Sequence, residues 1–413
     1  MKSICILLQN DYETDIRVRR KAEALVSAGY DVDLLAIRST YSKAKNYKLG
    51  GVNVYTISLG KKRGSRVRYA FEYLCFFFWA LYKVSILEHK KHYAVIDINN
   101  LPDFLVFAAI YPKWKGAKLI LDMHEVTPEF YISKYRIKPD SWLVGLLKFV
   151  EKISFNFVHQ VININQPIED LLVSRGLPRS KSTIVMNSVD EEFFNSANAA
   201  SDAVAASDAP PKFVMMYHGT VTDIYGLDIA IEAFGIAHHK MPGAEMWILG
   251  KGSDLSYLEK LARKLGLESK VRFVGLVLPQ QIPSWLKMCD VGILPTRQDV
   301  FLDLSFSSKL SEYIIMGKPV IASRLKTIRY YFSEEALAYF EPHNISDLAR
   351  QMVDLYREPS RRVQLAKRAI KEYRPIRWEV MKQRYLELLV DIRGDSKRDC
   401  TQSQAYDRSG AFR

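Results

Sequence analysis

Residues 303–323 read Asp303-Leu-Ser-Phe-Ser-Ser-Lys-Leu-Ser-Glu-Tyr-Ile-Ile-Met-Gly-Lys-Pro-Val-Ile-Ala-Ser323, and they predict a loop, a short helix and a buried strand. Gly317 suits the left-handed residue that ends a helix, and Pro319 prevents the helix from continuing. The apolar run 320–322 then predicts a strand that enters a sheet. The expected helix has an apolar face with i, i+3, i+4 spacing, formed by Leu310, Tyr313 and Ile314.

Several polar residues gather where this helix should begin, although the fold alone does not require them. Ser307 or Ser308 is expected to cap the helix, because a hydroxyl accepts a bond from a first-turn amide. A helix N-terminus attracts phosphate, and Lys309 adds a full positive charge there. Glu312 lies one turn further on, where its carboxylate can accept bonds from the hydroxyls of a ribose. The alternative is an ordinary capped helix with solvated charges.

Strands and helices alternate on both sides of this segment. Residues 3–8 predict a strand, 16–29 an amphipathic helix and 31–37 a second strand, so the two strands are expected to pair in parallel. Ligands of such sheets bind beyond the carboxyl ends of the strands, where the loop 9–15 is expected. That loop has no GxGxxG pattern, which argues against a nicotinamide cofactor.

The alternation restarts after a stretch of small polar residues, which predicts two doubly wound, Rossmann-like α/β domains that face each other across a cleft. The predicted organisation is an N-terminal domain over 1–195, a linker over 196–211, a C-terminal domain over 212–373, a helix over 374–393 that returns to the N-terminal domain, and a disordered tail over 394–413.

Charge and cysteine usage restrict the partners and the compartment. The net charge of +13 over 413 residues predicts an anionic partner, which nucleic acid, a nucleotide-sugar or an anionic membrane would satisfy. Basic residues are dispersed and no nucleic-acid-binding module is present, so nucleic acid is disfavoured. The four cysteines have no metal or redox spacing, and no signal peptide opens the chain. These features predict a cytoplasmic protein.

Two aromatic, basic helices are expected, over 61–90 and 140–157. In the first, Glu72 and Lys83 bracket only ten residues, whereas a membrane-spanning helix needs about 20 apolar residues. Basic flanks around an aromatic helix suit the surface of an anionic membrane. The alternative is a helix that packs on the sheet with some exposed rings.

An ordered set of short motifs resembles the retaining glycosyltransferases of family 4, which have the GT-B fold, over nearly the whole chain to about residue 390. The motifs are Asp15-Ile-Arg-Val-Arg-Arg, Ala28-Gly-Tyr-Asp-Val, Pro102-Asp-Phe-Leu-Val, Leu121-Asp-Met-His-Glu, Pro128-Glu, Met186-Asn-Ser-Val-Asp, His218-Gly-Thr, Tyr225-Gly-Leu-Asp, Gly250-Lys-Gly, Val271-Arg-Phe-Val-Gly, Leu310-Ser-Glu-Tyr and Gly317-Lys-Pro-Val-Ile-Ala.

This resemblance implies that the C-terminal half binds a nucleotide-sugar donor. Glu312 matches the second glutamate of the family's Glu-x7-Glu motif, which holds the donor ribose. The first glutamate falls on Leu304, and the family's diphosphate-clamping arginine and lysine fall near Thr220 and Tyr225, so the chain departs from the family at three positions. Lys309, Ser307, Ser308 and the amides at the start of the helix are expected to take over the phosphate role, and His218 is expected to assist. The other donor-side candidates are Gly219, Thr220, Gly250, Val274 and Leu310.

The resemblance also implies that the N-terminal half binds the acceptor. His124 matches a family histidine that contacts the transferred sugar. The catalytic candidates are His124, for this contact, and Lys309, for its expected role at the phosphates. The acceptor-side candidates are Asp15, Arg17, Asp103 and Glu125, although a solvated basic helix face remains an alternative for Arg17. The resemblance implies no dedicated general base. No DxD-type ligand set is recognised at the cleft, so neither a metal ion nor another cofactor is expected.

The sequence therefore predicts a glycosyltransferase that moves a sugar from a nucleotide-diphosphate sugar to a glycan or a lipid-linked acceptor. The enzyme is expected to act at the cytoplasmic face of a membrane. Its expected process is the synthesis of cell-surface polysaccharide. Two alternatives remain open, a GT-B sugar-nucleotide epimerase and a non-catalytic GT-B binding subunit. The epimerase would need acid–base carboxylates in the cleft, and Leu304 removes one candidate.

Overall fold

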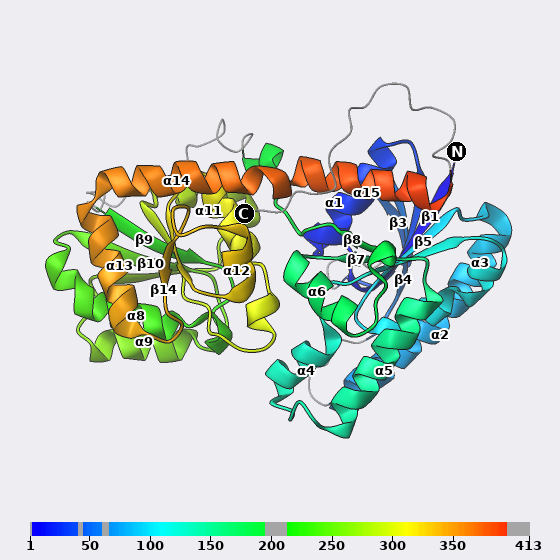
Figure 1. The fold of residues 1–413 in the computed structure, drawn as a ribbon, viewed down its shortest axis with the longest axis horizontal. Helices are drawn as coiled ribbons and strands as arrows, with labels where there is room; N and C mark the ends of the chain where they lie inside the picture. Colours follow the sequence, from blue (N-terminus) through cyan, green and yellow to red (C-terminus); the bar gives the residue numbers. More distant parts are fainter. Residues whose placement is uncertain (1, 40–43, 60–65, 195–212, 395–413) are drawn as a thin grey trace.

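The computed structural model describes residues 2–39, 44–59, 66–194 and 213–394. Figure 1 shows two α/β halves side by side, each with a sheet covered by helices. The predicted doubly wound architecture is confirmed in both halves. The predicted linker over 196–211, and the predicted tail from residue 395 onward, lie outside the described residues.

The N-terminal half is built on a sheet with the strand order β3-β4-β2-β1-β5-β6-β7-β8, and its strands pair in parallel except for β3 with β4. The strands are β1 (Ser3–Asp11), β2 (Asp31–Ile37), β3 (Asn46–Leu49), β4 (Val52–Ile57), β5 (Val95–Asn99), β6 (Lys118–Asp122), β7 (Gln160–Asn163) and β8 (Ser182–Ile184). The helices are α1 (Ile16–Ser27), α2 (Arg66–Lys91), α3 (Ile110–Trp114), α4 (Thr127–Tyr135), α5 (Trp142–Phe157) and α6 (Gln166–Ser174).

The C-terminal half has a parallel sheet with the order β11-β10-β9-β12-β13-β14. Its strands are β9 (Phe213–His218), β10 (Ala244–Leu249), β11 (Val271–Gly275), β12 (Val291–Leu294), β13 (Val320–Ser323) and β14 (Ala338–Phe340). Its helices are α8 (Leu227–Ala237), α9 (Leu255–Lys264), α10 (Ile282–Met288), α11 (Ser308–Ile315), α12 (Lys326–Tyr331) and α13 (Ile345–Arg357). The predicted face of α11 is buried, because Leu310, Tyr313 and Ile314 are at most 1% exposed.

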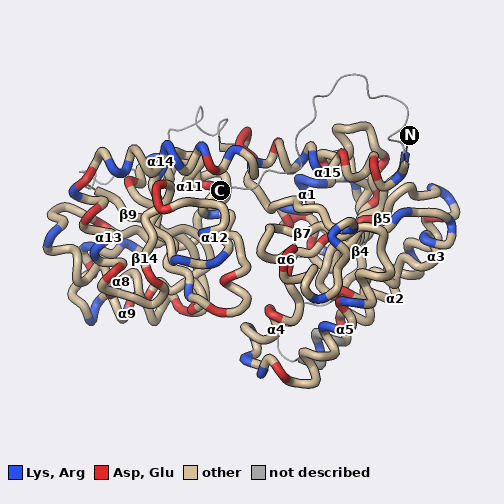
Figure 2. Tube along the Cα trace, viewed as in Figure 1, with Lys and Arg blue, Asp and Glu red and all other residues tan. Residues whose placement is uncertain are grey.

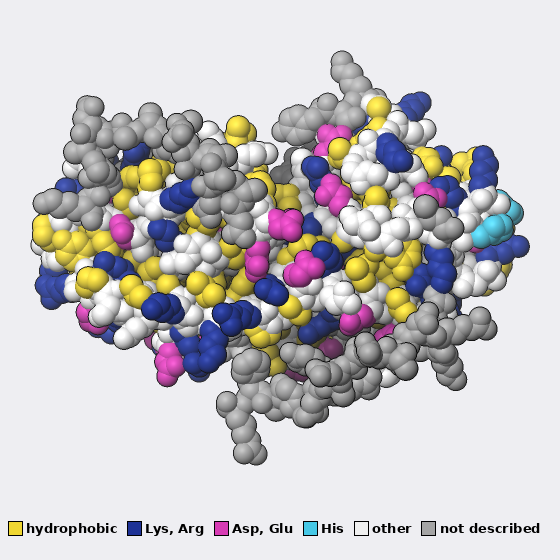
Figure 3. Space-filling view, turned by 90° about the horizontal axis from the view of Figure 1, so that it is seen from above, with side chains coloured by type: hydrophobic (Ala, Val, Ile, Leu, Met, Phe, Trp, Pro, Cys, Tyr) yellow, Lys and Arg dark blue, Asp and Glu magenta, His cyan; other side chains and the backbone are white. Residues whose placement is uncertain are grey.

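Two helices at the end of the chain connect the halves. Helix α14 (Pro359–Tyr373) lies along the C-terminal half, and α15 (Trp378–Ile392) continues over the N-terminal half (Figure 1). The Ser188 hydroxyl donates to the carbonyl of Ile376 between them, and Arg384 of α15 donates to the carbonyl of Ile184 at 3.1 Å. Figure 3 views the molecule from the side of α14 and α15 and shows the two halves as two lobes.

The halves also touch where α4 and the N-terminus of α6 meet the segment that precedes α11. Ser133 Oγ of α4 donates to Asp299 Oδ2 at 2.6 Å, and Asn165 Nδ2 donates to the carbonyl of Leu304 at 2.7 Å. The rings of Phe130 and Phe301 lie 5.5 Å apart in an edge-on arrangement. These contacts place the loop before α11 directly against the N-terminal half.

Residues Asp103–Ala109 form a 3-10 helix, η1, which α3 continues. One sequence expectation needs correction. The Ser307 and Ser308 hydroxyls do not cap α11. Ser307 is the N-cap residue without a side-chain bond, and its carbonyl instead accepts from the Leu310 amide at 3.1 Å. The backbone therefore closes the first turn without the hydroxyl.

Candidate active site

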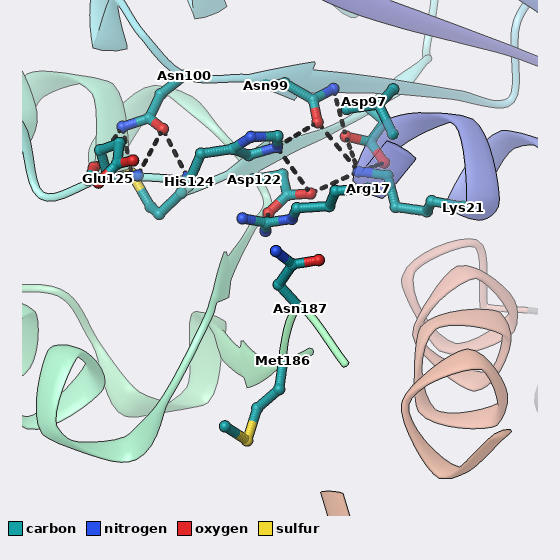
Figure 4. A network of polar contacts seen from close by, with 12 residues as sticks. Arg17, Lys21, Asp97, Asn99, Asn100, Asp122, His124, Glu125, Met186 and Asn187 are labelled. Atoms are coloured by element: carbon teal, nitrogen blue, oxygen red, sulfur yellow. Dashed lines mark hydrogen bonds and ion pairs between the residues drawn. The ribbon is translucent and has the colours of Figure 1, made fainter. Parts of the chain in front are cut away.

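A buried network of charges occupies the carboxyl ends of the central strands in the N-terminal half (Figure 4). Asp97 lies on β5, Asp122 ends β6, and Lys21 reaches both from α1. The Lys21 ammonium lies 2.9 Å from Asp97 and 2.5 Å from Asp122, while Arg17 binds the other oxygen of Asp122 at 2.6 Å. Two cations thus face two carboxylates, which satisfies the requirement that buried charges be paired.

The charges hold one another in the ionised state. Burial acts against the ionised form of Asp122, but Arg17 and Lys21 keep its pKa well below the ordinary value. Burial would lower the pKa of Lys21, yet Asp122 and Asp97 raise it above the ordinary value. The network is therefore a fixed electrostatic frame at neutral pH.

His124 follows β6 and rests on this frame. Its Nε2 lies 2.8 Å from the Asn99 side-chain oxygen and 3.6 Å from Asp122, so Nε2 carries the proton. The Asn99 amide nitrogen donates to the Leu7 carbonyl, which fixes the orientation of that amide. Burial, with the charge of Arg17, lowers the pKa of His124. The imidazole is therefore neutral at neutral pH, and its Nδ1 is a hydrogen-bond acceptor.

The other acceptor-side candidates have different surroundings. Burial raises the pKa of Glu125 to about 7, against the opposing charge of Arg17. Asp103 is 2% exposed and accepts bonds from Asn100 and Thr127, which makes it part of the interior beneath α4. Asp15 caps α1 by accepting from the Val18 amide at 3.1 Å. The structure therefore brings Arg17 and Glu125 close to His124, whereas Asp103 and Asp15 bond to neighbouring protein groups.

On the donor side, Lys309 begins α11 next to the turn that follows β9. Its ammonium lies 4.2 Å from the centre of the Tyr225 ring, and burial lowers its pKa to about 8. Gly219 has a φ of +126°, which favours glycine, and a Cβ there would lie 2.1 Å from Lys309 Cε, so a side chain would displace the end of the lysine. A Cβ at Gly250 would lie 1.8 Å from the Gly219 carbonyl oxygen. The two glycines therefore let backbone and lysine pack closely at the helix N-terminus.

Glu312 is oriented by His218 at the end of β9. His218 Nε2 lies 2.6 Å from Glu312 Oε2, and His218 Nδ1 lies 3.0 Å from the Tyr313 hydroxyl. The Tyr313 hydroxyl donates its proton to the Met216 carbonyl at 2.6 Å. About a fifth of the Glu312 side chain (19%) is exposed, so the carboxylate is held and still accessible. The expected assistance of His218 has a geometric basis, which is the orientation of Glu312.

The remaining donor-side candidates differ in accessibility. Thr220 is exposed, and its carbonyl accepts from the Tyr217 hydroxyl at 2.7 Å. The Leu310 side chain is fully buried, so only its backbone is available to a ligand. Val274 lies near the end of β11, half-buried. Ser307 and Ser308 are half-buried at the start of α11.

The three departures from the family pattern have visible consequences. Leu304 is 7% exposed and packs in the apolar cluster of the N-terminal half, so it contributes to the contact between the halves. Tyr225 covers the Lys309 ammonium. Thr220 carries no charge. Lys309 is thus the cation that the structure places at the start of α11.

Sequence reasoning missed Lys21, Asp97 and Asn99 as site residues. One signal was available, because Lys21 lies on the buried face of α1 that also contains Val18, Ala22 and Leu25. A charged residue at an apolar position of a helix demands a buried partner. Asp97 gave a similar signal as a carboxylate inside a buried strand.

The chain is similar in sequence to known glycosyltransferases. A family model described as "Glycosyltransferase Family 4" matches residues 15–193, and one described as "Glycosyl transferases group 1" matches residues 212–358. The D-inositol 3-phosphate glycosyltransferase of Kribbella flavida is 21% identical over 89% of this chain and 88% of its own length. The lipopolysaccharide core biosynthesis glycosyltransferase LpsE of Rhizobium meliloti is 27% identical over 39% of this chain and 44% of its own length.

Solved structures share the fold. Anabaena HepE in complex with UDP superposes with a TM-score of 0.69 at 16% identity, over 95% of this chain and all of the other. The trehalose 6-phosphate synthase of Burkholderia multivorans gives a TM-score of 0.74 at 12% identity, over 98% of this chain and all of the other. With a match to a glycosyltransferase family in each half and GT-B proteins as structural neighbours, the chain is a family 4-like glycosyltransferase of the GT-B fold.

Proposed function

We propose that the protein is a retaining glycosyltransferase that moves a sugar from a nucleotide-diphosphate sugar to a glycan or lipid-linked acceptor in cell-surface polysaccharide synthesis. The observation that carries the proposal is the placement of Lys309 and Glu312 at the start of α11, beside Gly219. A buried ammonium and an accessible, oriented carboxylate one turn apart suit a diphosphate and a ribose.

The donor-side groups match the parts of such a donor. A diphosphate carries negative charge, which the N-terminus of α11 and the Lys309 ammonium would stabilise without a metal ion. Glu312 is held by His218 through one oxygen, which leaves the other for a ribose hydroxyl. HepE, which has the same fold, binds UDP and UDP-glucose in its solved structures. We therefore propose a nucleotide-sugar as the donor.

The acceptor-side groups suit the transfer step. In the proposed reaction, the bond between the anomeric carbon and the diphosphate oxygen breaks, and the acceptor oxygen bonds to that carbon on the same face. The acceptor proton goes to the leaving diphosphate, so no protein base is needed. Lys309 would stabilise the charge that develops on the diphosphate, and neutral His124 would accept a hydroxyl bond from the transferred sugar.

We propose that the N-terminal half rests on the cytoplasmic face of an anionic membrane. Helix α2 exposes an apolar stripe of Phe71, Leu74, Phe78 and Tyr82, and α5 exposes Trp142, Leu146 and Phe149. The side chains of Phe78 and Trp142 are 61% and 79% exposed. Both helices pack against η1, and Figure 1 draws them on the outer side of this half. Among the described residues, no helix is both long and apolar enough to cross a bilayer.

Basic residues are spread over both halves in Figure 2, including the neighbourhood of α5. Lys148 and Lys152 lie on α5 itself, so the apolar stripes are accompanied by positive charge. Interfacial helices bind anionic lipid through such a combination of apolar area and charge. This combination supports an anionic membrane surface over nucleic acid as the partner.

Calorimetric titration with UDP, GDP, ADP and their common sugar conjugates tests the donor site. One nucleotide should bind selectively, and Glu312→Ala should weaken that binding by about 1.5–3 kcal/mol, the contribution of a charged hydrogen bond. Glu259→Ala on α9 is the matched control, because Glu259 is exposed and lies outside the site. Absence of binding by the whole panel, or equal affinity of the two variants, would contradict the proposal and favour the binding-subunit alternative.

Flotation with vesicles tests the membrane surface. The protein should bind vesicles that contain anionic phospholipid, and it should bind less well at high salt or to neutral vesicles. The double variant Phe78→Ser with Phe149→Ser should lose most of this binding. Leu276→Ser with Leu278→Ser removes two side chains of similar exposure from the other half and should have no effect. Equal binding by both double variants would exclude this surface.

A further inference from the structure

The last helix of the chain contributes a side chain to the interior of the acceptor side. Tyr385 of α15 is fully buried, and its hydroxyl donates to Asp97 Oδ2 at 2.6 Å. The Lys21 ammonium lies 5.3 Å from the centre of the Tyr385 ring. A helix that follows the whole C-terminal half therefore contacts the charged frame beneath His124.

A continuous set of contacts leads from Tyr385 to His124. Asp97 receives the Tyr385 hydroxyl and binds Lys21, whose ammonium also contacts Asp122 and lies 3.3 Å from the Asn99 oxygen. The same Asn99 oxygen accepts the His124 Nε2 proton. Each group in this set is at least half-buried, so each bond constrains the next one.

We propose that Tyr385 is a positioning residue for the acceptor-side site, which it fixes through Asp97, Lys21 and Asn99 so that His124 keeps its orientation and tautomer. This inference rests on the proposed function of His124. It assigns to the crossing helix a role in the chemistry in addition to its role as a connection between the halves.

The Lys21 ammonium is shared between the Asp97 and Asp122 carboxylates and the Asn99 oxygen. Asp97 has the Tyr385 hydroxyl as a donor, so it draws less strongly on the Lys21 ammonium, which remains available to Asp122 and Asn99. Without the hydroxyl, Lys21 would move towards Asp97. The charge on Asp122 would then be less neutralised, and Asn99 would lose a bond that holds its oxygen beneath the imidazole.

Tyr385→Phe tests the inference because it removes the hydroxyl and keeps the ring. Tyr339→Phe is the matched control. Tyr339 is 2% exposed in the C-terminal half, and its hydroxyl donates to the Phe332 carbonyl at 2.8 Å. The measurements are melting temperature, kcat and KM with the donor found by titration, and the NMR titration of His124, assigned by comparison with His124→Gln.

We expect Tyr385→Phe to lower kcat about tenfold, within the range that a slightly misplaced group can cost, with the donor KM unchanged. The titration midpoint of His124 should rise, because Lys21 then neutralises the charge of Asp122 less and the carboxylate favours a protonated imidazole. Tyr339→Phe should lower the melting temperature by a similar amount and change neither kcat nor the titration. The comparison of the two variants thus distinguishes an effect of lower stability from an effect on the position of His124.

If Tyr385→Phe matches Tyr339→Phe in kcat and in the His124 titration while His124→Gln loses activity, the positioning role is overturned and the proposed function stands. If His124→Gln keeps full activity, the proposed function of the acceptor side fails, and the inference fails with it. A His124 midpoint that falls in Tyr385→Phe would also overturn the inference, because the shared-lysine argument requires a rise.

Discussion

Donor affinity should depend on pH through Lys309. Burial lowers the pKa of this ammonium to about 8 in the free protein. A bound diphosphate would favour the charged form and raise the pKa again, because opposite charges at short distance stabilise each other. Above pH 8 the free lysine is largely neutral, so binding of the donor must recruit a proton.

The size of this effect follows from the pKa. At pH 9, one unit above the midpoint, recruiting the proton costs about 1.4 kcal/mol, which is a tenfold loss of affinity. At pH 7 the lysine is already charged and the cost is negligible. Affinity for the nucleotide-sugar should therefore be constant up to about pH 7.5 and fall about tenfold by pH 9.

Calorimetry at pH 7, 8 and 9 measures this directly, and two buffers with different ionisation enthalpies count the protons taken up. Lys309→Met should bind more weakly and have a flatter pH profile. Lys309→Arg is the control, because arginine stays charged over this range. Proton uptake near zero at pH 9, or the same pH dependence in Lys309→Met as in the wild type, would refute the role of Lys309 at the diphosphate.

Two further predictions concern stability. Burial raises the pKa of Glu151, which is 1% exposed, from 4.5 to about 8. The unfolded chain releases this proton near pH 4.5, so the free energy of unfolding should fall by up to about 1.4 kcal/mol per pH unit between pH 4.5 and 8. In urea unfolding, the free energy of unfolding of Glu151→Gln should depend less on pH than that of the wild type. An equal pH dependence in the two proteins would exclude Glu151 as the cause of the fall. Leu304→Glu restores the family's residue but buries a carboxylate in the apolar cluster, so unfolding experiments should show a loss of more than about 2 kcal/mol. A fully stable variant with higher donor affinity would contradict this account of Leu304.

Local sequence patterns predicted the parts of the site that lie within one element and its flanking turns. The helix at 308–315 follows from its apolar spacing and from Gly317 and Pro319, and the structure contains it with the expected face buried. The placement of Lys309 and Glu312 one turn apart follows from the helical period alone.

The parts that the sequence did not predict depend on contacts between distant segments. Lys21 and Asp97 are 76 residues apart, and Tyr385 and Asp97 are 288 residues apart. The position of Lys21 on the apolar face of α1 indicated that it is buried, but the carboxylates that pair with it come from strands that the sheet brings beneath the helix. Ser307 offered a capping hydroxyl, but the backbone closed the turn. In each case the contacts made in the folded protein, and not the local sequence preference, determine the structure.

The central claim is that α11 holds a nucleotide-sugar with its sugar directed at His124. A crystal structure with the nucleotide-sugar selected by titration tests this most directly. We expect a ribose hydroxyl on Glu312, the diphosphate on Lys309 and on the first amides of α11, and the sugar within hydrogen-bond distance of His124. A nucleotide bound with its ribose away from Glu312, or with its sugar away from His124, would contradict the account.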